Sequence, residues 1–173
     1  MKLIFSLISL FCLFLLNPLQ SQNLQESQCP CCTDNHNSFD FWIGEWEVFD
    51  TLGNIQGTNR IEKIVKNCII SENWEGKSNY LGKSYNYFNN VDSTWNQLWI
   101  DQNGNQLIMK GHGSDGKMVL QSDLTTGRSG TEYRNRITWT RQENGDVVQQ
   151  WDVVSKEGKI LSTAFYGIYR KKE

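Results

Sequence analysis

The fold is decided by one short stretch, Phe39-Asp40-Phe41-Trp42-Ile43-Gly44-Glu45-Trp46. Trp42, Gly44 and Trp46 occupy alternate positions, so on a pleated strand the two indoles and the glycine would share one face. A glycine there leaves room where another segment passes close to the backbone. The pattern is typical of a buried first strand with aromatic core residues. It also matches the opening of a small antiparallel barrel whose closed end is plugged by the Gly-x-Trp segment.

Downstream of this stretch, strand-like segments alternate with turn signals at nearly even spacing. Pairs such as Asn103-Gly104, Asp115-Gly116 and Asn144-Gly145 supply the positive φ angles of tight hairpins. The expected strands span about residues 42–50, 57–65, 67–75, 78–88, 94–101, 106–112, 117–123, 132–141, 147–154 and 160–170. So long a meander exposes two edges unless it closes. The sequence therefore predicts an all-β fold: a single antiparallel up-and-down β-barrel of about ten strands, lipocalin-like.

The N-terminal residues have the layout of a secretory signal peptide. Lys2 is followed by an apolar run over residues 3–16 and by a small-residue exit near Ser21. This run is too short for a comfortable membrane span, so we expect an exported protein, periplasmic or secreted. The predicted organisation is a signal peptide at 1–22, a cysteine-rich leader at 23–37 and one barrel domain at 38–173.

The cysteines predict disulfides rather than a metal site. Outside the signal peptide the chain has Cys29, Cys31, Cys32 and Cys68, and in an exported protein four cysteines allow three pairings. Because a bond between the neighbours Cys31 and Cys32 would be strained, we expect at least one cysteine of the cluster to reach Cys68. The alternative is a thiolate site completed by His36, but Cys-x-Cys-Cys lacks the paired spacing of zinc modules. We expect no metal and no cofactor.

Charge and motifs exclude several function classes. The formal net charge is −2 and no polybasic run occurs, so we expect no nucleic-acid partner. The chain has no Gly-x-Ser-x-Gly, phosphate loop, His-Glu-x-x-His or dinucleotide fingerprint. Common hydrolase, kinase and redox chemistries therefore have no support in the sequence.

Indoles and polar side chains recur together on the same strand faces. If these faces line the lumen, the cavity suits flat sugar rings and hydroxyls rather than an acyl chain, because buried polar groups need partners. Alternation alone does not tell the inside from the outside, so the same faces on the exterior are the alternative. The predicted substrate-binding residues are Trp74, Trp95, Gln97, Trp99, Asp101, Asn135, Trp139, Gln149 and Trp151.

Three residues are the predicted catalytic groups: His112, Tyr133 and Arg136. A histidine titrates near neutral pH and suits acid–base work. A tyrosine serves in the same role only if a neighbouring cation lowers its pKa, and an arginine grips a carboxylate with two N–H groups. The other residues weighed for these roles are Tyr80, Tyr169, Arg60 and Arg134.

Together with residues 59–61, 135–139 and 166–170, the opening stretch resembles a family of exported bacterial proteins with lipocalin-like barrels. The chain also resembles, more weakly, the ulvan-oligosaccharide dehydratases of marine Bacteroidetes, without a matching catalytic motif. That resemblance implies a secreted dehydratase or lyase acting on uronic-acid-containing oligosaccharides.

Eliminating water across C4 and C5 of a uronate needs a cation or amide for the carboxylate, a base and an acid. The carboxylate would be held by Arg136 or Arg134 with Asn135, the base would be His112 and the acid a tyrosine. The two arginines alternate with Asn135 along one strand, so they lie on the face opposite to it. The alternatives are a non-catalytic carrier of a small hydrophobic molecule and a metal-handling role for the cysteine cluster.

Overall fold

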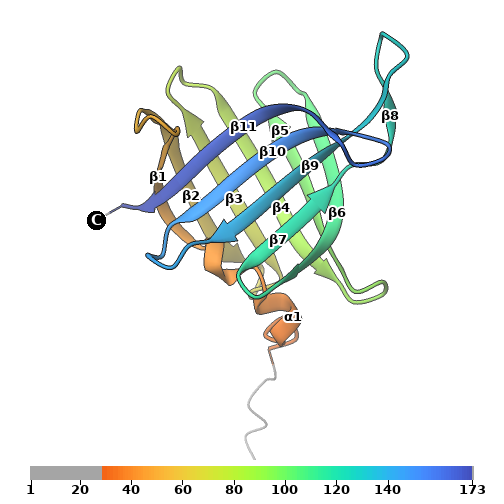
Figure 1. The fold of residues 1–173 in the computed structure, drawn as a ribbon. Helices are drawn as coiled ribbons and strands as arrows, with labels where there is room; N and C mark the ends of the chain where they lie inside the picture. The colour runs from red at the N-terminus through yellow and green to blue at the C-terminus, as the bar shows by residue number, and fades with distance from the viewer. Residues whose placement is uncertain (1–28, 173) are drawn as a thin grey trace, which may run out of the picture.

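The structure is a computed structural model that describes residues 29–172, so the predicted signal peptide and residues 23–28 of the leader lie outside the described residues. Two short helices, α1 (Asp34–Asn37) and η1 (Asp40–Trp42), precede an antiparallel barrel (Figure 1). The barrel strands are β1 (Gly44–Phe49), β2 (Ile55–Ile64), β3 (Ile69–Gly76), β4 (Leu81–Asn89), β5 (Thr94–Asp101), β6 (Gln106–Ser114), β7 (Lys117–Gln121), β9 (Glu132–Arg141), β10 (Val147–Ser155) and β11 (Ile160–Lys171). The two-residue strand β8 (Thr125–Thr126) pairs with β9 beside the barrel.

Hydrogen bonding closes the sheet on itself. Each barrel strand pairs with the next barrel strand along the chain, which for β7 is β9, and β11 returns to β1. The closing register places Glu47 opposite Arg170 and Val48 opposite Tyr169. The predicted ten-stranded antiparallel barrel is therefore confirmed. Its edges are satisfied by closure.

The hairpin turns follow the local chemistry that predicted them. At the turn between β6 and β7, Asp115 and Gly116 both have positive φ angles, 51° and 78°. Asp and Gly tolerate this left-handed region better than other residues, and such turns match the twist of the strands they join. Successive turns fall at opposite ends, so one end carries the β1–β2, β3–β4, β5–β6, β7–β9 and β10–β11 connections.

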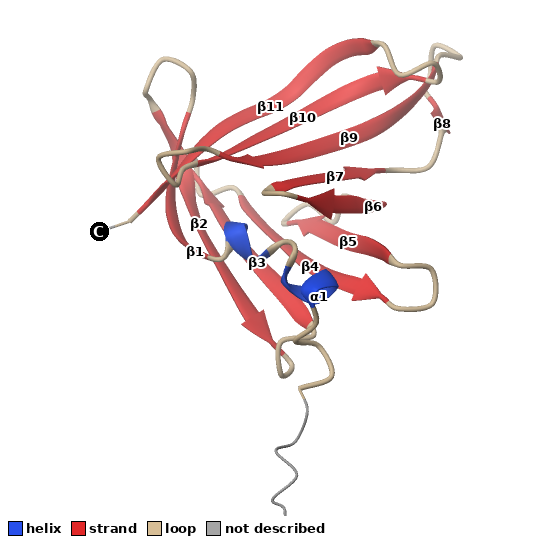
Figure 2. Ribbon diagram, turned by 60° about the horizontal axis from the view of Figure 1, so that its bottom comes forward, coloured by secondary structure: helices blue, strands red, loops and turns tan. Residues whose placement is uncertain are grey.

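The other end is closed by the segment before β1 (Figure 2). Phe39 and Trp42 are fully buried and stacked with ring centroids 5.0 Å apart, and Trp42 lies 5.3 Å from Trp139. The expectation that Trp42 lies on the first strand is wrong. The Ile43 N–H donates to the Asp40 carbonyl and makes a 3-10 turn, so the strand begins only at Gly44.

Gly44 is required by its backbone conformation. Its φ of +151° lies in a region that other residues rarely adopt, whereas an added Cβ would make only an ordinary contact, at 3.4 Å, with the indole of Trp46. The Trp46 Nε1 in turn donates to the Trp42 carbonyl at 2.9 Å. The close neighbour of the glycine is thus the indole two residues on, not another segment of the chain.

Both cysteine pairs form disulfides, Cys31–Cys68 and Cys29–Cys32. The predicted bond from the cluster to Cys68 is confirmed, and it ties the leader to the turn between β2 and β3. With all four sulfurs oxidised, no thiolate remains for the alternative metal site.

His36 is buried within the leader and has a structural role. Its Nδ1 lies 2.7 Å from the Thr33 hydroxyl, and its ring contacts Phe88 edge-on at 5.3 Å between centroids. Within residues 29–172, no group of three or more His, Cys, Asp or Glu side chains is placed to hold a metal ion. Over the same residues no helix is long and apolar enough to cross a membrane.

Replacing both Cys31 and Cys68 by serine is expected to lower the free energy of unfolding by about 3–4 kcal/mol, because the bond closes a long loop of the unfolded chain. Urea unfolding measures the loss. The matched control replaces Cys29 and Cys32 by serine. Its bond spans a sequence separation of 3 against 37, so its loss should be clearly smaller. Equal losses from the two double variants would contradict the role of Cys31–Cys68 as the tie between leader and barrel.

Candidate functional site

A cavity of about 500 Å³ occupies the lumen on the side away from the helices. Tyr80 and Asn105, in the turns that precede β4 and β6, contribute to its rim. The cavity is lined by Glu72, Trp74, Tyr80, Gln97, Trp99, Asp101, Asn105, Leu107, Ile137, Trp139, Gln149, Trp151, Ala164, Phe165 and Tyr169. Indoles and amides therefore face the same enclosed space.

Most of the predicted binding residues meet in this cavity. Those that line it are Trp74, Gln97, Trp99, Asp101, Trp139, Gln149 and Trp151. Trp95 lies deeper, at the closed end, where its Nε1 donates to the Ser38 hydroxyl at 2.9 Å and its ring contacts Phe39. Asn135 shares the inward face of β9 with Ile137 and Trp139 but is not part of the lining, and its Oδ1 accepts from Trp151 Nε1 at 2.9 Å. Trp95 supports the closed end, and Asn135 orients an indole of the site.

The indoles are held in two edge-to-face pairs. Trp99 and Trp151 have ring centroids 6.2 Å apart, and Trp74 contacts Phe165 at 5.9 Å. A Cβ at Gly82, on the neighbouring strand, would lie 2.9 Å from Trp99 Nε1, so only glycine leaves room for this ring. Aromatic pairs of this geometry are rigid, so the cavity has a defined shape before a ligand enters.

Glu72 is the acidic group at the centre of the site. Its side chain is buried, Oε1 accepts from Asn59 Nδ2 at 2.8 Å, and Oε2 accepts from the Ser84 hydroxyl at 2.7 Å. Ser84 lies directly opposite Glu72 in the β3–β4 register, which explains the second contact. Burial raises the pKa of Glu72, and the two hydrogen bonds offset part of that rise. A buried carboxyl group with a raised pKa in a cavity wall is a candidate for acid–base catalysis.

A chain of side chains fixes the orientation of this carboxyl group. Asn86 Nδ2 donates to the Ser84 hydroxyl at 2.9 Å, and Gln97 Nε2 donates to Asn86 Oδ1 at 2.8 Å. On the other side, the Tyr169 hydroxyl donates to Gln149 Oε1, and Asn59 Nδ2 lies 3.4 Å from the Tyr169 hydroxyl. Because Gln149 accepts through its oxygen, its amide N–H groups are available to a ligand.

At the rim, Tyr80 and Asp101 form a second polar pair. The Tyr80 hydroxyl donates to Asp101 Oδ2 at 2.5 Å, which lowers the pKa of Asp101 to about 2. Burial and the same carboxylate raise the pKa of Tyr80 to about 12. Burial also raises the pKa of Tyr169 well above 10. The cation that a tyrosine base requires does not line this cavity, so these tyrosines stay protonated and act as hydrogen-bond donors.

The three predicted catalytic residues are not brought together. His112 is exposed and lies on the outward face of β6. The odd-numbered residues of this strand, such as Leu107 and Met109, face the lumen, so His112 faces away from it. Arg136 faces outward from β9 and forms an ion pair with Asp152 at 3.4 Å. Tyr133 is half-buried on the lumen side of β9, next to β8 and outside the cavity lining. None of the three is placed to act on a ligand in the lumen.

The arginines weighed for a carboxylate grip are also outside. Arg60 is exposed and pairs with Glu62 at 3.5 Å, and Arg134 shares the outward face of β9 with Arg136. The residues that line the cavity include no arginine, lysine or histidine. The polar groups that a ligand in the cavity would contact are therefore neutral donors and two acids, Glu72 and Asp101.

Two buried polar atoms near Glu72 lack partners within residues 29–172: Trp139 Nε1 and Asn59 Oδ1. Trp139 lines the cavity, and an unpaired buried N–H costs roughly 1–3 kcal/mol. Both atoms are shielded from the cavity itself, so a ligand in the lumen does not reach them.

Glu72 was overlooked because the sequence does not show burial. The sequence does show that Glu72 shares a strand face with Trp74. If that face points inward, the carboxyl group is buried together with the indole. With that face assigned to the lumen, Glu72 is the acid–base candidate and replaces His112.

The raised pKa of Glu72 predicts a pH dependence of stability. Above its ordinary value of 4.5 the unfolded chain releases this proton while the folded protein keeps it, so stability falls as the pH rises toward the folded pKa. Urea unfolding between about pH 4 and 8 measures this, and subtracting the curve of Glu72→Gln removes the contributions of other carboxyl groups. A difference that stays flat, or rises with pH, would show that Glu72 is not buried as described.

No model of a known protein family matches the chain, and no curated protein matches it in sequence.

Proposed function

We propose that the protein binds the end of an oligosaccharide in the lumen and eliminates water from a uronic acid residue there. The observation that carries this proposal is a buried carboxyl group, Glu72, in the wall of a cavity lined by indoles and amides. Sugar rings present apolar faces that stack on indoles and hydroxyl edges that bond to amides and acids. The cavity offers both, at a volume of about 500 Å³ that suits one or two sugar residues.

Recognition of the acidic sugar would rely on neutral donors. Elimination requires that the substrate carboxylate be neutralised while the C5 proton is removed, and an amide serves this purpose as a cation does. The Gln149 amide is the lumen group available for it. The lack of a cation in the lining favours a substrate with one carboxyl group over a highly charged one.

Glu72 would supply the acid–base chemistry. Its carboxylate takes the proton from C5, the electrons of that C–H bond form the C4–C5 double bond, and the C4–O bond breaks. The departing hydroxyl receives the proton from Glu72 and leaves as water. One carboxyl group performs both steps when the hydrogen and the hydroxyl leave from the same face of the ring. The raised pKa of Glu72 makes its ionised form a stronger base.

An exported setting is part of the proposal. The predicted signal peptide motivates it, and the two disulfides fit an oxidising compartment. A periplasmic or secreted protein would meet oligosaccharides released from polysaccharides outside the cell.

The test is an absorbance assay on a panel of uronate-ended oligosaccharides. Unsaturated uronate absorbs near about 230 nm, so a rise at that wavelength reports elimination. His112→Ala is the matched control, because this histidine is exposed on the outer face and should leave the rate unchanged. No rise with any substrate of the panel would reject the enzyme.

A carrier of a small hydrophobic molecule is the second candidate. The apolar part of the lining, Leu107, Ile137, Ala164 and Phe165, favours it. Fatty acids should then quench the tryptophan fluorescence with saturation at one equivalent. Gln97, Asp101 and Gln149 in the same lining argue for a polar ligand instead, so neutral sugars and fatty acids should be titrated side by side.

A further inference from the structure

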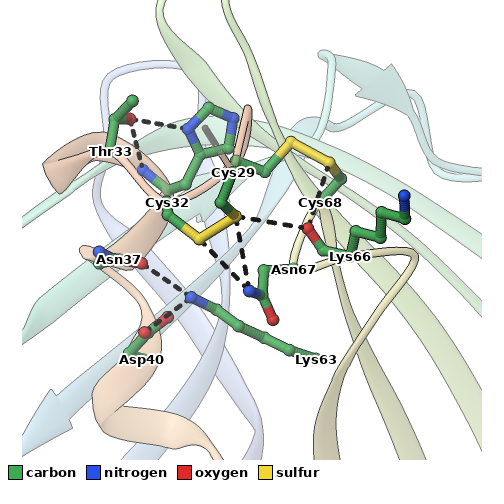
Figure 3. The surroundings of a disulfide bond; sticks show 11 residues. Cys29, Cys32, Thr33, Asn37, Asp40, Lys63, Lys66, Asn67 and Cys68 are labelled. Carbon is green, nitrogen blue, oxygen red and sulfur yellow. Dashed lines mark hydrogen bonds and ion pairs between the residues drawn. A yellow bond between two sulfur atoms is a disulfide. The ribbon is translucent and has the colours of Figure 1, made fainter. Parts of the chain in front are cut away.

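The two disulfides of the leader differ in what they hold (Figure 3). Cys31–Cys68 joins segments separated by 37 residues, whereas Cys29–Cys32 encloses only Pro30 and Cys31. Opening Cys29–Cys32 therefore leaves the leader attached to the barrel. Cys32 is exposed and Cys29 is half-buried, so an incoming thiol reaches the Cys32 sulfur first.

The groups around Cys29 and Cys32 can stabilise the two reduced thiols as well as the disulfide. Asn67 Nδ2 lies 3.3 Å from Cys32 Sγ and 3.6 Å from Cys29 Sγ, and an N–H group directed at sulfur stabilises a thiolate. The Lys66 carbonyl oxygen lies 3.8 Å from Cys29 Sγ and offers an acceptor to its thiol hydrogen. Asn67 holds this place with a φ of 69°, a left-handed conformation that asparagine tolerates.

We propose that Cys29–Cys32 is a thiol–disulfide exchange site that accepts two electrons from thiols in the surroundings of the exported protein. A thiolate of the partner attacks Cys32 Sγ, the Cys29–Cys32 bond breaks, and Cys29 leaves as a thiolate next to Asn67. A second partner thiolate attacks the partner sulfur of the mixed disulfide and releases Cys32. Two electrons and two protons pass to Cys29 and Cys32, and the partner thiols become a disulfide. This site is separate from the lumen and does not depend on its function.

The test uses the full chain in glutathione buffers of graded redox ratio, followed by alkylation and peptide mass spectrometry. We expect a folded species that carries labels on Cys29 and Cys32 at ratios where Cys31–Cys68 is still intact. Simultaneous reduction of both bonds, earlier reduction of Cys31–Cys68, or reduction only in denaturant would overturn the proposal. A second arm replaces glutathione by a reduced dithiol peptide. A faster reaction with the peptide identifies protein dithiols as the partners, and a faster reaction with glutathione identifies small thiols.

Two variants separate exchange from mere exposure. Asn67→Ala should slow the reduction of Cys29–Cys32 about threefold to tenfold, since it removes the N–H donor to the leaving sulfur. Asn79→Ala is the matched control, because Asn79 also has a positive φ of 55° but lies in the β3–β4 turn. In Cys29→Ser, oxidised glutathione should form a mixed disulfide with Cys32. Equal rates for Asn67→Ala and Asn79→Ala, together with an unmodified Cys32 in Cys29→Ser, would contradict the assignment.

Discussion

Replacing Glu72 by glutamine is expected to lower the rate of unsaturated-uronate formation at least about 100-fold, the usual contribution of a general acid–base group. Glutamine has the same shape, its oxygen still accepts from Asn59, and its amide N–H groups can donate to the Ser84 hydroxyl. The fold should therefore persist while the proton acceptor is lost. The initial rate at about 230 nm measures the effect.

The control for this result is Glu75→Gln on the same strand. Glu75 is exposed, so this substitution removes one negative charge from β3 without reaching the lumen. Its rate should match that of the wild-type protein. If Glu72→Gln kept its activity, or Glu75→Gln lost as much, Glu72 would not be the acid–base group.

Replacing Trp42 by alanine is expected to lower the free energy of unfolding by about 3–5 kcal/mol, as for other buried tryptophans. The indole is fully buried, stacks on Phe39 and contacts Trp139, so alanine leaves a cavity at the closed end of the barrel. Urea or guanidinium unfolding followed by far-UV circular dichroism measures the loss.

The matched control is Tyr87→Ala, an aromatic truncation on the outer face of β4. Tyr87 is 44% exposed, so its removal should cost under about 1 kcal/mol. Similar losses for the two variants would mean that the segment before β1 does not close the barrel. The same comparison separates stability from function, because neither residue lines the cavity.

The barrel was predictable because its signals are local. Turn pairs such as Asp115-Gly116 and the period-two alternation of the strands fix where the chain reverses, and closure then follows from the cost of exposed edges. The short helices α1 and η1 were not predicted, since one turn is too short to show a helical period. For the same reason the sequence pattern extends the first strand back to Trp42, where the structure has a 3-10 turn.

The site was predictable only in part. The faces that carry Trp74, Trp99 and Trp151 stand out in the sequence because each also carries polar side chains, but the alternation does not say which face is inside. His112 was chosen for its chemistry alone, and its strand places it outside. The sequence does not point to Glu72 because its raised pKa arises from burial inside the closed barrel, which strands distant in sequence create; the hydrogen bonds from Asn59 and Ser84 offset part of that rise.

The most direct measurement is a crystal structure of Glu72→Gln soaked with a uronate-ended oligosaccharide. We predict that the terminal sugar lies in the lumen against the Trp99 and Trp151 rings, with its C5 facing residue 72 and its carboxyl group near the Gln149 amide. A lumen that holds only water or an acyl chain, with the sugar absent or bound on the outer surface, would contradict the proposed function.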